Sequence, residues 1–153
     1  MSPQVLESSE ERLVVDGADQ ILGRLASIVA KKLMGGQRVV IVNAEKIVVS
    51  GPKNRVIQGY KLMFRLRTMY NPLKQGVRRP RDPIRLVRKA VKGMLPKNRE
   101  SKEMMRRLKV YVGLPRHLEG VKGVKFNQAS KERLRGEYLT LGELAKELGW
   151  HNE

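Results

Sequence analysis

The cations of this chain are the residues best suited to bind a ligand. Between Lys53 and Lys109 the sequence contains 19 basic and 3 acidic residues, so this stretch carries a net charge of +16 in a chain of net charge +17. A solvated basic surface normally includes compensating acids, because unrelieved repulsion destabilises a compact chain. The missing countercharge therefore predicts a polyanionic partner whose phosphates contact these side chains.

The composition of the basic stretch indicates which polyanion it would bind. Arginine outnumbers lysine between Arg65 and Arg88, which favours forked phosphate contacts and stacking on bases. Aromatic residues are sparse there, essentially Phe64 and Tyr70, which argues against a stacking platform for single strands. Folded RNA, recognised by its shape and backbone, fits better. The candidate RNA-binding residues are Lys61, Arg65, Arg67, Lys74, Arg78, Arg79, Arg81, Arg85, Arg88, Lys89, Lys92, Lys97, Arg99 and Arg106.

Residues of the types that catalyse reactions or bind metals are few and scattered. The chain has no cysteine, and its two histidines, His117 and His151, have no second ligand at metal-binding spacing. Ser50, Ser101 and Ser130 stand in no motif of a nucleophile. We therefore expect no enzyme, no metal or other cofactor and no small-molecule substrate.

The segment from Asp16 to Gly23 is the one place where a nucleotide site could be imagined. Gly17 and Gly23 do not match the spacing of the dinucleotide-binding turn, and no phosphate-binding Gly-Lys-Ser/Thr loop occurs. Gly23 is better explained by a close approach of a helix to a sheet, and Asp19 by capping of that helix. A small α/β enzyme with a nucleotide pocket nevertheless remains an alternative, as does a free-standing RNA- or DNA-binding factor.

The hydrophobic pattern predicts a β-α-β unit at the start of the chain. Residues 12–15 form a short strand, and apolar residues at helical spacing predict a helix over 20–34. The continuous apolar run at 39–42 is typical of a strand covered on both faces. Strand, helix and buried strand in this order predict two parallel strands. Val40 and Ile41 are expected in the core.

The remaining elements follow from turn residues and caps. Asp82 caps a helix that has Ile84, Val87, Val91 and Met94 on its apolar side. Thr140 and Glu143 have the spacing of a capping box. We expect strands at 47–49 and 108–112, helices at 52–67, 83–94, 99–107 and 141–148, a structureless basic loop at 70–83, and an irregular surface segment at 115–136.

Five short motifs occur in order between about residues 13 and 114. They are Val15-Asp-Gly-Ala18 with Ile21-Leu-Gly-Arg-Leu-Ala26, Val39-Val-Ile-Val-Asn-Ala-Glu-Lys-Ile47, Ser50-Gly51, Lys89-Ala-Val-Lys-Gly-Met-Leu-Pro-Lys97, and Leu108-Lys-Val-Tyr-Val-Gly-Leu-Pro115. Through these motifs the chain resembles the universal large-subunit ribosomal protein thirteen family. The closing 138–150 segment is more similar to archaeal than to bacterial members.

This resemblance implies a three-layer α/β/α domain with a mainly parallel four-stranded sheet. It also implies a structural protein that binds large-subunit ribosomal RNA early in assembly and has no enzymatic activity. We expect a single domain over 1–153, with a family core at 12–114 and an extension at 115–153. The expected partners are ribosomal RNA and neighbouring ribosomal proteins, in the cytoplasm, without a membrane and without homo-oligomerisation.

Overall fold

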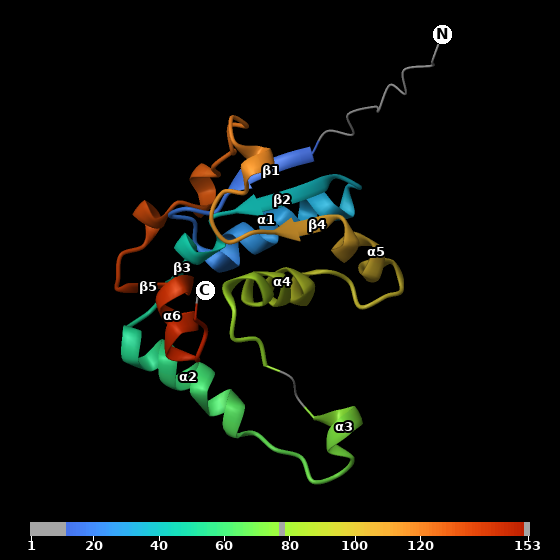
Figure 1. The fold of residues 1–153 in the computed structure, drawn as a ribbon, viewed down its shortest axis with the longest axis vertical. Coiled ribbons are helices and arrows are strands. Elements are labelled where there is room, and N and C mark those ends of the chain that lie inside the picture. Colours follow the sequence, from blue (N-terminus) through green and yellow to red (C-terminus); the bar gives the residue numbers. More distant parts are fainter. Residues whose placement is uncertain (1–11, 77–78, 152–153) are drawn as a thin grey trace.

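A three-stranded parallel sheet forms the centre of the computed structural model, which describes residues 12–76 and 79–151 (Figure 1). The strand order is β1-β2-β4, and both pairings are parallel. The register places Val14 beside Val40 and Ile41 beside Val110. The predicted β-α-β unit is confirmed. Its elements are β1 (Arg12–Asp16), α1 (Leu22–Met34) and β2 (Arg38–Val42), and β4 is Leu108–Val110.

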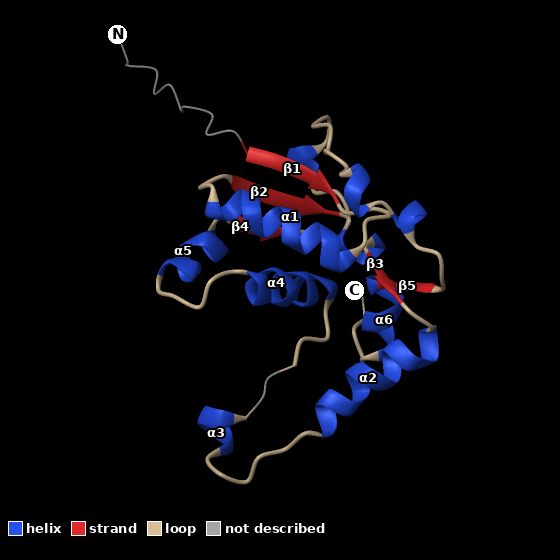
Figure 2. Ribbon diagram, turned by 180° about the vertical axis from the view of Figure 1, so that it is seen from behind, coloured by secondary structure: helices blue, strands red, loops and turns tan. Residues whose placement is uncertain are grey.

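Two helices cover one face of this sheet. Figure 2 shows α1 and α4 (Pro83–Met94) next to one another on that face. The strands alternate, so Val15, Ile41 and Leu108 point into the main core together with the buried sides of both helices. The buried positions of Val40 and Ile41 confirm that β2 belongs to the core.

The opposite face of the sheet has a different cover from the one expected. Val14, Val40 and Val42 form a second, small apolar cluster with Tyr111 and with Leu118, which belongs to a 3-10 turn, η2 (Arg116–Leu118). No α-helix of the described residues packs there. The continuous apolar run of β2 correctly indicates two buried faces, but a short turn is enough to cover the second. The expected three-layer arrangement is thus not the one observed.

The expected strand at 47–49 does not join the main sheet. Asn43 adopts a left-handed conformation (φ 57°) and starts a 3-10 turn, η1 (Ala44–Lys46), which redirects the chain after β2. The next strand, β3 (Val48–Ser50), then pairs antiparallel with β5 (Tyr138–Thr140), a strand not expected from the sequence. The sheet therefore has three strands rather than four.

The extension after residue 115 is part of the packed structure. Val124 bridges the free edge of β1, where its N–H donates to Val14 O at 2.8 Å. Ala129 is fully buried, and its carbonyl accepts a hydrogen bond from the Ile21 N–H at 2.7 Å. Two more 3-10 turns, η3 and η4, interrupt the otherwise irregular segment, and the expected closing helix follows β5. These elements are η3 (Asn127–Ala129), η4 (Lys131–Arg133) and α6 (Leu141–Glu147).

A long arm extends away from the sheet between β3 and α4 (Figure 1). It contains α2 (Lys53–Arg65) and a short helix, α3 (Pro72–Gln75), within the segment that we expected to be structureless. Ile57 is the buried residue of α2, whereas Leu62 and Leu73 are 60% and 89% exposed. Among the described residues, no helix has both the length and the apolar character needed to cross a membrane.

The turn after β1 differs from expectation in two details. Ile21, not Asp19, precedes the first residue of α1, and Asp19 has a left-handed backbone (φ 62°) with its Oδ1 2.8 Å from Lys131 Nζ. Gly23 has open space where a Cβ would lie. Gly17 is the glycine that permits a close approach, because a Cβ there would lie 2.8 Å from a side-chain carbon of Ile47.

Candidate nucleic-acid interface

The helix α4 presents the densest group of cations on a well-anchored element. Asp82 caps its N-terminus as predicted, with a side-chain oxygen 3.4 Å from the Arg85 N–H. Leu86, Val87 and Val91 are buried against the core, while Met94 is 43% exposed. The buried side of α4 therefore includes Leu86, which was not predicted, and excludes Met94, which was predicted. The opposite side carries four exposed cations, as predicted: Arg85, Arg88, Lys89 and Lys92.

These cations line an open groove between α4 and α5 (Glu100–Arg106), which we call the α4–α5 groove. Its volume is about 630 Å³, and no acidic residue of the described chain lines it. Six cations do so, which gives the groove a strongly positive potential suited to a phosphate backbone. The lining residues are Arg79, Pro80, Arg85, Arg88, Lys89, Lys92, Ser101, Lys102 and Met105.

Two predicted cations of the loop also hold the arm in place. The Arg79 side chain is half-buried, and its Nε donates to Met63 O at 3.4 Å. The Arg81 guanidinium lies over the Phe64 ring, 5.1 Å from its centroid, within the range of a cation–π interaction. Both contacts join the returning chain to α2, so Arg79 and Arg81 position the arm relative to the groove.

The other predicted cations that the structure describes are exposed but do not line the groove. Lys61 forms an ion pair with Glu147 of α6, at 3.5 Å between Nζ and Oε2. Arg106 lines a separate cleft on the sheet. Arg78 lies outside the described residues. The remaining predicted cations lie at the end of α2, on α3, and in the connection between α4 and α5: Arg65, Arg67, Lys74, Lys97 and Arg99.

Sequence reasoning missed Ser101 and Lys102 in the groove and a second basic region on the sheet. Lys102 could have been predicted, because on the helix expected over 99–107 it shares a face with Arg99 and Arg106, which were predicted to bind RNA. The second region could not be found by charge density, since Arg12 and Arg38 come from a nearly neutral part of the sequence. They meet only because β1 and β2 pair in register.

The fold and the groove define a small, basic α/β domain with a surface complementary to a phosphate backbone. A family model described as ribosomal protein L13 matches residues 10–117. The chain is 49% identical over 144 residues to the large ribosomal subunit protein uL13 of Sulfolobus acidocaldarius, covering 94% of this chain and 97% of that one.

Similarity extends to more distant relatives. The Aeropyrum pernix protein of the same name is 45% identical, with 95% of this chain and 96% of that chain covered. The Caenorhabditis elegans protein is 38% identical, with 93% and 71% covered. The chain therefore belongs to the ribosomal protein L13 family, and it is of the archaeal type. This is a family of structural ribosomal proteins, not of enzymes.

Proposed function

We propose that this chain is a structural constituent of the large ribosomal subunit that binds and stabilises folded large-subunit ribosomal RNA, early in assembly and in the cytoplasm. The α4–α5 groove carries this proposal, because six cations line one opening that no acidic residue of the described chain lines. Asp82, outside the lining, pairs with Arg85 alone among the described cations, at 3.6 Å between the carboxylate oxygen and Nε. The names of the family and of its archaeal relatives support the ribosomal setting. Phosphates of RNA would supply the missing negative charge.

The chemistry of the groove favours recognition of RNA shape. Arg85 and Arg88 offer planar forks that can contact two phosphate oxygens at once, whereas Lys89 and Lys92 act as compact point charges. No aromatic ring lines the groove, so stacking on splayed bases is not its mode of binding. A groove of this kind fits the backbone of a folded RNA, whose phosphates have fixed spacing.

The exposed apolar side chains of the arm support a second class of partner. Leu62, Leu66, Met69, Tyr70 and Leu73 are all more than half exposed, and a single-domain protein rarely leaves so many large apolar groups in water. Their alternation with Lys61, Arg65 and Arg67 suits a boundary where RNA and a neighbouring ribosomal protein meet. Such neighbours are part of the proposed setting.

Sedimentation tests the proposal directly. A tagged copy expressed in an archaeal relative should cosediment with the large subunit in near-stoichiometric amount on a sucrose gradient. The variant Arg85→Ala/Arg88→Ala/Lys89→Ala/Lys92→Ala should move into the slowly sedimenting fractions. A matched control, Lys31→Ala/Lys32→Ala on the exposed side of α1, should remain with the subunit.

Two results would contradict the proposal. Wild-type protein that sediments apart from the large subunit would indicate a free-standing nucleic-acid-binding factor. A groove variant that cosediments as well as wild type would show that the groove does not hold RNA.

A further inference from the structure

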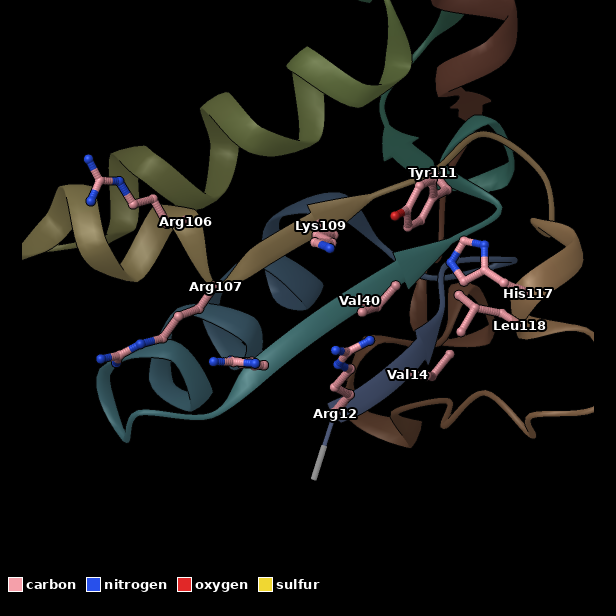
Figure 3. A pocket seen from close by; sticks show the side chains of 10 residues that line it. Arg12, Val14, Val40, Arg106, Arg107, Lys109, Tyr111, His117 and Leu118 are labelled. Atoms are coloured by element: carbon pink, nitrogen blue, oxygen red, sulfur yellow. The ribbon is translucent and has the colours of Figure 1, made fainter. Parts of the chain in front are cut away.

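A second basic hollow lies on the face of the sheet opposite α1 and α4. We call it the sheet cleft. Its floor comes from alternate residues of β1 and β2, and its walls from the chain that follows β4 and from η2. The volume is about 260 Å³. Figure 3 shows Arg12, Val14, Val40 and Lys109 on neighbouring strands, with Tyr111, His117 and Leu118 grouped at one end. The lining residues are Arg12, Val14, Arg38, Val40, Arg106, Arg107, Lys109, Tyr111, His117 and Leu118.

Strand register brings the cations of this cleft together. Arg12 pairs with Arg38 across β1 and β2, and Lys109 of β4 is the partner of Val40. Arg107 precedes β4 at the same end of the sheet, and the side chains of Arg106 and Arg107 both extend outward at the edge of the cleft (Figure 3). No acidic residue of the described chain lines the cleft. Arg12, Arg107 and Lys109 place three cations at this end, which suits a ligand that carries negative charge there.

The other end of the cleft is apolar and aromatic. Val14 and Val40 form its floor, and Leu118 packs against them from the wall. Tyr111 and His117 stand edge to face beside them, with ring centroids 5.6 Å apart and planes inclined at 76°. A flat apolar group with polar edges could lie on this floor against a ring. In contrast to the α4–α5 groove, the sheet cleft thus combines a cationic end with a stacking surface.

We propose that the sheet cleft binds one unpaired nucleotide of RNA, with its base against the Tyr111 end and its flanking phosphates at Arg12, Arg107 and Lys109. This inference rests on the proposed function, because it assumes RNA as the partner. The cleft is smaller than the roughly 300–1,000 Å³ of pockets that enclose a whole small ligand, which fits one residue of a polymer. An unpaired nucleotide exposes both the ring to stack and the two phosphates to pair.

The sheet cleft and the α4–α5 groove lie at separate places on the domain. The α4–α5 groove and the sheet cleft flank α5, since Ser101 and Lys102 line the former and Arg106 lines the latter. Val40 and Ile41, adjacent in β2, point to opposite faces of the sheet. One domain would therefore hold two separate RNA segments, one by its backbone and one by an extruded nucleotide.

The test compares two RNA hairpins of the same sequence, one with a single unpaired adenosine and one in which that adenosine is paired. Binding of the full chain is measured by fluorescence anisotropy. Wild type should prefer the hairpin with the unpaired adenosine by about fivefold or more, the effect of one base–aromatic stack. Tyr111→Leu and His117→Ala should lose this preference. The exposed position of His117 keeps the test valid if Tyr111→Leu perturbs packing.

Charge variants separate the two surfaces. Lys109→Gln should weaken binding of the hairpin with the unpaired adenosine more than binding of the paired one. The groove variant Arg88→Ala/Lys92→Ala should weaken both equally and keep the preference. Lys122→Gln, an exposed cation outside both surfaces, should change neither.

The outcomes distinguish failure of this inference from failure of the proposed function. Wild-type binding of both hairpins without preference, or a preference that survives Tyr111→Leu and His117→Ala, overturns the nucleotide site and leaves the groove proposal intact. Absence of binding to either hairpin overturns both. Normal RNA preference in Tyr111→Leu combined with loss from the large subunit would assign the cleft to a protein partner and overturn the inference.

Discussion

Asn43 Nδ2 donates a hydrogen bond to Asp16 Oδ1 at 2.9 Å and so joins the carboxyl ends of β1 and β2. The same carboxylate accepts the Ala18 N–H at 3.0 Å, and its other oxygen lies 3.4 Å from Lys125 Nζ. Burial by itself raises the pKa of Asp16, but the hydrogen bonds from Asn43 and Ala18 and the charge of Lys125 outweigh it, so the pKa lies below its ordinary value. Asp16 links the sheet to the extension.

We predict that Asp16→Ala destabilises the domain by roughly 1–3 kcal/mol, the usual loss when a hydrogen-bonded, partly buried charge is removed. The measurement is urea unfolding at pH 7. Glu119→Ala, which removes an exposed carboxylate, is the control and should stay within about 0.5 kcal/mol of wild type. A loss no larger than that of the control would contradict the linking role.

The lowered pKa of Asp16 predicts a pH dependence with a definite sign. Because the folded pKa lies below the unfolded value of 3.8, the contribution of ionised Asp16 is fully present above that value. It is lost as the pH falls through the lower folded pKa. The stability difference between wild type and Asp16→Asn should therefore shrink between pH 5 and pH 2. A difference that stays constant over this range would show that the charge is irrelevant.

Gly17 and Gly23 form a matched pair for a packing test. A Cβ at position 17 would lie 2.9 Å from the Val42 carbonyl oxygen as well as against Ile47, so Gly17→Ala should cost about 1–3 kcal/mol by overpacking. Gly23→Ala adds its methyl group to open space within α1 and should stabilise by roughly 0.5–1 kcal/mol. Thermal unfolding of both variants measures this. Equal shifts in Tm would refute the close approach at Gly17.

The six cations of the groove predict a steep salt dependence. If all six contact phosphates, log Kd against log salt concentration for large-subunit RNA should have a slope magnitude of about 4 or more, at roughly 0.7–0.9 per phosphate. Each of Arg85→Ala, Arg88→Ala, Lys89→Ala and Lys92→Ala should reduce this magnitude by about 1. Filter binding from 50 to 300 mM salt measures it. A slope near zero would contradict binding through contacts between these cations and phosphates.

The same variants should leave the fold intact. Their side chains are exposed, where substitutions usually change stability by less than about 0.5 kcal/mol each. Val40→Asp or Ile41→Asp should instead unfold the domain, because an unpaired buried charge is expensive. Circular dichroism of the two groups shows the contrast. Equal loss of structure in both groups would mean that the helix face at Arg85–Lys92 is part of the core.

The sequence predicts the elements that have a strong local signal. The β-α-β unit, the Asp82 cap and the basic side of α4 follow from periodicity and spacing, and the structure confirms them. Five of the predicted cations line one groove. Local signals could not reveal β5, because its pairing with β3 joins residues about ninety positions apart. They also could not reveal the sheet cleft, whose cations come from three separate parts of the sequence, at β1, at β2 and around the start of β4.

Amide hydrogen exchange should be faster in the arm than in the central sheet. Residues 66–76 include α3, which has no buried residue, and Met69, which is fully exposed. With so little apolar burial to offset about 1–2 kcal/mol of backbone entropy per residue, their amides should exchange rapidly in the free protein. Amides of β2 should exchange slowly. In the assembled subunit the arm should become protected. Slow exchange of the arm in isolation would rule out ordering coupled to RNA.

The pairing of β3 with β5 has a consequence for the order in which the chain is made. Ile47 and Val48 are buried beside Leu139, Leu141 and Leu144, which are synthesised about ninety residues later. At roughly 5–20 residues per second, this delay is several seconds. The basic arm and α4 lie within that interval of the sequence. A nascent chain therefore exposes the cations of α4 before β3 can pair with β5, so these cations are accessible to a polyanion before the fold is complete.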